Sequence, residues 1–145
     1  MMLDTRSAAA VAGAIRRERL SLLAYMADAV PWGTEKQGPD VQALLDVSRA
    51  VGDAAGSLGR FLMKRRITPP MTGSYPTYFT YCNFLAVDWL LPRLIAAEQA
   101  SLATLDGDVR ATPDADAKQL LAALAEVKRT GLARLEALAA RPAAA

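Results

Sequence analysis

The chain has 145 residues, a formal net charge of +2 and a hydrophobic fraction of 52%, of which few residues are aromatic. This length suits one domain whose core needs no disulfide or metal, and the near-neutral charge gives no reason to expect a nucleic-acid-binding protein. Many alanines and leucines, with little valine or isoleucine, favour helices over strands. We therefore expect one all-helical domain over residues 1–145.

Features that report on location point to the cytoplasm. Cys82 is the only cysteine, so no intrachain disulfide can form and a reducing compartment is the simplest interpretation. Acidic and basic residues interrupt the N-terminal stretch where a signal peptide needs an apolar run. No uncharged window of 18 residues is continuously apolar, which argues against a transmembrane span.

The first predicted helix covers residues 7–30 and ends at Pro31 and Gly33. Its inward stripe contains Glu18 at a position where leucine is expected. The second predicted helix covers residues 40–66 and opens with a proline and an aspartate. Three glycines recur on one of its faces, which suggests that a neighbouring helix or a ligand approaches the backbone closely there; they are Gly52, Gly56 and Gly59.

The third predicted helix covers residues 77–105 and is the most apolar part of the chain. Two apolar stripes run along it, more than a small bundle has to bury, so we expect this helix to mediate self-association or binding of a protein partner. Pro92 removes a backbone hydrogen bond and should kink the helix. Tyr78 and Tyr81 lie near its start, either as a stacking platform for a flat ligand or as a lid on the core.

The fourth predicted helix covers residues 113–140, and residues 141–145 form a frayed tail. The ten residues 67–76 contain two consecutive prolines and reverse the chain more easily than they carry it back along a helix. Four helices joined by short loops indicate an antiparallel four-helix bundle with a kinked third helix. In such bundles, functional sites lie among the inward polar side chains.

Some of these polar residues resemble the ferritin-like superfamily, including bacterioferritins. The segment from Glu18 to Tyr25 resembles its first helix, where a metal-binding glutamate precedes a tyrosine by seven residues. Glu98 looks like the glutamate of its third helix, and Glu126 falls near the glutamate of its fourth-helix E-x-x-H motif, with Arg129 at the histidine position. The resemblance implies a long connection between the second and third helices and a metal, iron or manganese, at Glu18, Glu98 and Glu126.

The chain departs from this family at its most specific positions. It has no histidine, and its second helix has no E-x-x-H motif, so the usual di-iron site cannot be assembled. Simple up-and-down stacking gives a competing interpretation, in which Glu18, Asp88 and Arg129 lie at one level and form a buried ionic network. A buried carboxylate needs a partner, and we expect an arginine or a tyrosine hydroxyl beside each one.

The sequence contains no G-x-S-x-G motif, phosphate-binding loop or zinc-ligand pattern. It therefore favours a non-catalytic helical protein without a cofactor, which acts through homo-oligomer formation or a protein partner. The alternative is a degenerate ferritin-like protein that binds a metal through carboxylates, or a small ligand between its helices. The candidate residues for an inter-helix polar or ligand site are Glu18, Tyr25, Tyr78, Tyr81, Asp88 and Arg129.

Overall fold

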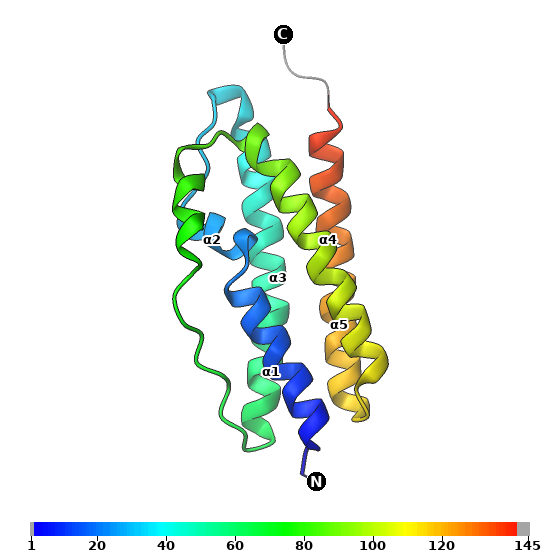
Figure 1. Cartoon of the computed structure of the whole chain (residues 1–145). Coiled ribbons are helices and arrows are strands. Elements are labelled where there is room, and N and C mark those ends of the chain that lie inside the picture. Colours follow the sequence, from blue (N-terminus) through cyan, green and yellow to red (C-terminus); the bar gives the residue numbers. More distant parts are fainter. Residues whose placement is uncertain (1, 142–145) are drawn as a thin grey trace.

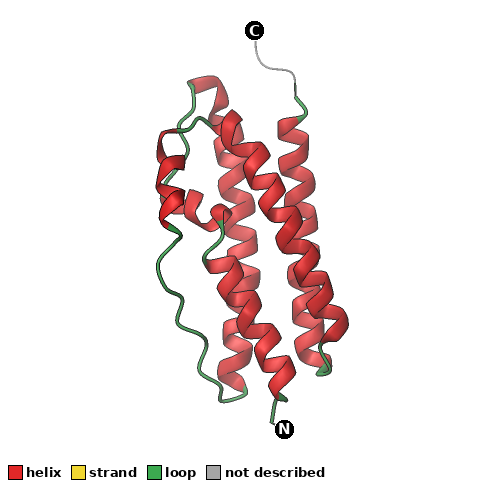
Figure 2. Cartoon of the chain, viewed as in Figure 1, coloured by secondary structure: helices red, strands yellow, loops and turns green. Residues whose placement is uncertain are grey.

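The structure is a computed structural model that describes residues 2–141, without the side chain of Phe84. Its helices are α1 (Thr5–Arg19), α2 (Leu22–Asp28), α3 (Gly38–Lys64), α4 (Val87–Ala111) and α5 (Ala115–Ala139), with two 3-10 helices, η1 (Glu35–Gln37) and η2 (Thr77–Phe84). Residues 2–141 are helical or irregular, as Figure 2 shows, and their only β contact is an isolated bridge between Trp32 and Ala86. No helix in this part of the chain is both long and apolar enough to cross a membrane.

The long helices α1, α3, α4 and α5 lie side by side along one axis (Figure 1). α5 packs against both α3 and α4, and α1 packs chiefly against α3. α1 and α5 run in one direction, while α3 and α4 run in the other, so these three pairs are antiparallel. The all-helical prediction is confirmed, and the helices predicted over 40–66 and 113–140 correspond to α3 and α5.

The connection between α3 and α4 runs along the whole molecule. α3 ends near the N-terminus of the chain, and α4 begins at the opposite end (Figure 1). The expectation of a simple reversal after α3 was therefore wrong, as was the predicted third helix over 77–105, because an α-helix forms only from Val87 to Ala111. Prolines at 69, 70 and 76 keep the intervening chain extended, and about twelve extended residues span about 40 Å, the length of α3.

The first predicted helix, residues 7–30, is broken in two at Ser21. Ser21 has extended backbone angles, and its hydroxyl accepts a hydrogen bond from Ala24 N at 3.0 Å, so it is the N-cap of α2. The same hydroxyl donates to the Glu18 carbonyl at 2.9 Å, which satisfies a free carbonyl at the end of α1. Ser48 of α3 donates to the Leu23 carbonyl at 3.1 Å and fixes α2 against the long helices.

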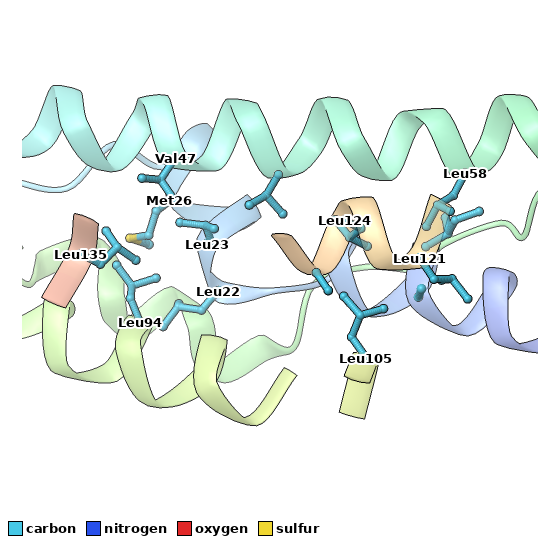
Figure 3. Packing of buried hydrophobic residues seen from close by; sticks show 14 of the residues in the cluster. Leu22, Leu23, Met26, Val47, Leu58, Leu94, Leu105, Leu121, Leu124 and Leu135 are labelled. Atoms are coloured by element: carbon cyan, nitrogen blue, oxygen red, sulfur yellow. The ribbon is translucent and has the colours of Figure 1, made fainter. Parts of the chain in front are cut away.

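The core is lined by side chains from all five α-helices. Figure 3 shows the labelled residues in two groups, one around Leu94 and Leu135, and the other around Leu105, Leu121 and Leu124. Eleven residues separate the groups along both α4 and α5, which corresponds to about 16 Å of helix. Buried polar residues occupy the intervening stretch of each helix.

The predicted close approach at the glycines of the second helix was wrong. A Cβ atom at Gly52 would have no neighbour within 4 Å, and at Gly56 and Gly59 it would meet only the ends of arginine side chains, at 3.5 Å or more. The close approach is at Gly131 of α5, where a Cβ atom would lie 2.6 Å from a methyl group of Val47. α3 and α5 can therefore pack at this distance only with glycine at position 131.

Candidate functional site

A buried lysine joins two buried carboxylates at the centre of the molecule. Lys128 Nζ of α5 lies 2.8 Å from the carboxylate of Glu18 in α1 and 2.6 Å from Oε2 of Glu98 in α4. The lysine is 1% exposed and each glutamate 4%. We call these three residues the ionic triad.

The triad accepts one further hydrogen bond from a neighbouring side chain. Ser101, one turn after Glu98 on α4, donates its hydroxyl to Glu18 Oε1 at 3.1 Å. Charge-assisted hydrogen bonds of this length are needed to offset the loss of water from buried charges. With both carboxylates ionised the triad has one negative charge in excess, because a single ammonium faces two of them.

Burial and the excess negative charge both make the Glu98 carboxyl group harder to ionise. Loss of water raises its pKa above the ordinary 4.5, and the charge of Glu18 adds to the rise, while Lys128 partly opposes it. Among the described residues, the only hydrogen bond to the Glu98 carboxylate comes from Lys128, and it uses Oε2. Oε1 therefore has no hydrogen-bond partner within this part of the protein.

A pocket of about 860 Å³ reaches Glu98 from the surface. It lies between the end of α1, the start of α2, η2 and α4, and we call it the Glu98 pocket. Its lining residues are Arg16, Arg17, Leu20, Ser21, Leu22, Tyr78, Phe79, Tyr81, Cys82, Leu85, Arg93, Ala96, Ala97, Glu98 and Ser101. The break at Ser21 helps to form this pocket, because the chain leaves the line of α1 directly beside it.

The walls of the pocket are apolar and its charged residues are mostly arginines. Leu20, Leu22, Phe79 and Leu85 form much of the wall, and the short side chains of two alanines leave space along α4. Three arginines line the pocket against one glutamate. Such a combination of apolar walls with a few polar groups is typical of small-molecule sites, whose volumes lie between about 300 and 1,000 Å³.

The structure contradicts the predicted network of Glu18, Asp88 and Arg129. Because α4 starts at Val87, Asp88 is in its first turn, where it is exposed and accepts a hydrogen bond from Gln37 Nε2 at 2.7 Å. Arg129 is exposed and pairs with Asp106 at 2.6 Å and with Glu126 at 2.9 Å. It follows Lys128 directly, and a helix turns about 100° per residue, so Arg129 points away from the core.

The three carboxylates of the metal alternative do not gather either. Glu18 and Glu98 come together, as the resemblance implied, but Glu126 is exposed and pairs with Arg129. In residues 2–141, no three histidine, cysteine, aspartate or glutamate side chains are close enough to hold a metal ion. The ammonium group of Lys128 lies between the two glutamates.

The three predicted tyrosines lie on the α2–η2 side of the molecule. Tyr25 is half-buried, donates a hydrogen bond to Asn83, and packs against Tyr75 at 5.2 Å and Phe79 at 5.6 Å between ring centroids. Tyr78 and Tyr81 are 65% and 77% exposed and line the Glu98 pocket. Tyr25 therefore packs on the core as a lid, while the other two are accessible to a ligand.

Lys128 is the residue that the sequence interpretation missed. We expected an arginine or a tyrosine beside the buried carboxylates, but a lysine and a serine satisfy them. A signal was present, because Lys128 continues a series of core positions spaced by four and three residues; the buried members are Ala117, Leu121, Leu124, Lys128, Gly131 and Leu135.

Comparisons of the chain with protein-family models, curated proteins and solved structures gave no match. The function is therefore inferred from the geometry of the ionic triad and the Glu98 pocket.

Proposed function

We propose that this chain is a non-catalytic protein that binds a small organic molecule in the Glu98 pocket. The observation that carries the proposal is an apolar pocket of about 860 Å³ that extends from the surface to a buried carboxylate. The pocket contains one thiol, Cys82, and the chain has no histidine to activate it. Binding is thus better supported than covalent catalysis.

We further propose that the fold is a four-helix bundle related to the ferritin-like superfamily, with α4 kinked at Pro92. Two observations support this relation: the long connection between α3 and α4, and the meeting of Glu18 with Glu98. In this proposal Lys128 supplies the positive charge that a metal ion supplies in the family. Binding of iron or manganese would require the ammonium group to leave the two carboxylates.

The proposal is tested by filling the pocket. Ala97 and Ala100 are both exposed on α4, but only Ala97 lines the pocket. The neutral dye N-phenyl-1-naphthylamine, which fluoresces in apolar surroundings, should bind the wild-type protein. Ala97→Trp should weaken its binding at least tenfold, and the matched control Ala100→Trp should leave it unchanged.

Native mass spectrometry of protein purified without chelator or affinity metal complements this test. A co-purified organic mass that is lost in Ala97→Trp would support the proposal. Bound iron or manganese that disappears in Glu18→Gln would favour the metal alternative instead. Equal dye binding by wild type and both tryptophan variants would refute a ligand site in this pocket.

Self-association remains a second candidate function, and the two tryptophans favour it. Trp32 and Trp89 are each 64% exposed, and the bridge between Trp32 and Ala86 brings Trp32 to the start of α4, where Trp89 lies. The occupant we propose for this surface is a second copy of the chain. Sedimentation velocity at micromolar concentration should then show a dimer that Trp89→Ser dissociates, whereas a monomeric wild type would refute this candidate.

A further inference from the structure

The charges around the Glu98 pocket indicate which class of molecule it accepts. Two of its three arginines, Arg16 and Arg93, are exposed and form no ion pair within residues 2–141. Arg17 is paired with Asp108 at 2.5 Å. The guanidinium group of Arg93 lies 5.9 Å from the Trp89 ring centroid and donates to the Trp89 carbonyl at 2.9 Å, so its position is partly fixed.

The single acid in the lining does not balance these arginines. Glu98 is buried at the inner end and is already engaged with Lys128 at 2.6 Å. The exposed part of the lining is therefore positively charged, while the wall between these arginines and Glu98 is apolar. A guanidinium group binds a carboxylate with two parallel hydrogen bonds, so a carboxylate is well matched to such a rim.

From this arrangement we infer that the ligand is an amphipathic carboxylate, a molecule with an apolar chain and one carboxylate group. The inference rests on the proposed ligand-binding function and specifies it. The carboxylate lies at the rim with Arg16 and Arg93, and the chain extends along Leu20, Leu22 and Phe79. The opposite orientation would bring the ligand's carboxylate against Glu98, and like charges in a low-dielectric site repel strongly.

The inference is tested with three ligands of equal chain length: decanoate, decanol and decylamine. Each is used to displace N-phenyl-1-naphthylamine from the full chain, below its micelle concentration. Decanoate should displace the dye at about one tenth of the decanol concentration, because two exposed ion pairs contribute modestly. Decylamine should be the weakest competitor. High salt should reduce the preference for decanoate, since it screens exposed charges.

Variants of the arginines separate this inference from the underlying function. In the double variant Arg16→Gln with Arg93→Gln, displacement of the dye should require as much decanoate as decanol. Arg129→Gln, an exposed arginine outside the pocket, should retain the preference. Tighter binding of decylamine, or no preference in the wild type, would overturn the inference while leaving ligand binding intact. Failure of the dye itself to bind would refute both.

Discussion

Lys128 is the cation that allows two carboxylates to be buried in the core. A lysine is almost never fully buried unless it is paired, and here it has a carboxylate on each side. Its aliphatic stem continues the apolar stripe of α5, and its ammonium group balances one of the two negative charges that Glu18 and Glu98 bring in. Each of the three residues therefore depends on the other two.

Lys128→Met should destabilise the protein by about 3 to 5 kcal/mol, because it leaves two buried carboxylates without a cation. The triple variant that adds Glu18→Gln and Glu98→Gln removes the uncompensated charges and should recover most of this loss. Urea denaturation followed by circular dichroism measures the free energy of unfolding of both variants. If Lys128→Met were as stable as wild type, the ionic triad would not be formed in solution.

The raised pKa of Glu98 predicts a specific pH dependence. The folded state holds a proton on Glu98 at pH values where the unfolded chain has lost it, so this group's contribution to stability is complete below about pH 4.5 and is lost as pH rises through the folded pKa. The free energy of unfolding of wild type, relative to Glu98→Gln, should therefore fall with rising pH. Glu126→Gln, which removes a carboxylate that is 75% exposed, serves as the matched control.

Among the helices, the contact of α3 with α5 depends on a glycine, and the division of α1 from α2 depends on a serine. Gly131 permits Val47 to contact the backbone of α5 directly. Ser21 ends one helix and begins the next with a single hydroxyl, which donates to Glu18 and accepts from Ala24. Neither role follows from helix propensity, because both depend on what lies opposite the residue.

Two glycine substitutions should have opposite effects. Gly131→Ala brings a methyl group 2.6 Å from Val47, and it should destabilise the protein by about 1 to 3 kcal/mol despite better helix propensity. Gly52→Ala places a methyl group in open space and should stabilise it by up to about 1 kcal/mol. Thermal unfolding of the two variants measures this difference. If Gly131→Ala were also stabilising, α3 and α5 would have to lie farther apart than the structure shows.

In the molecule as a whole, the connection between α3 and α4 sets the direction of α4. Because the chain returns to the far end before α4 begins, α4 and α1 run in opposite directions. This arrangement brings Glu98 rather than Asp88 to the level of Glu18. It also places η2 beside α2, where it closes one side of the Glu98 pocket.

The length of this connection can be tested directly. Deleting residues 69–74 leaves too few residues to span about 40 Å, so it should unfold the protein or displace α4. Inserting six glycine and serine residues after position 72 should cost less than about 1 kcal/mol, because loop entropy grows slowly with length. Equal tolerance of both changes, measured by urea denaturation, would indicate a short reversal instead of a full-length connection.

The all-helical class and the positions of α3 and α5 could be predicted from the sequence, because composition, caps and apolar periodicity are local properties. The sequence also identified Glu18 and, through the family resemblance, its meeting with Glu98. It could not show that Asp88 and Arg129 are exposed, or that Lys128 is the cation of the site. A one-residue error turns a helical side chain by about 100°, and the direction of α4 depends on a connection whose path has no local signal. Which charges meet in the core therefore follows from the packing of distant helices.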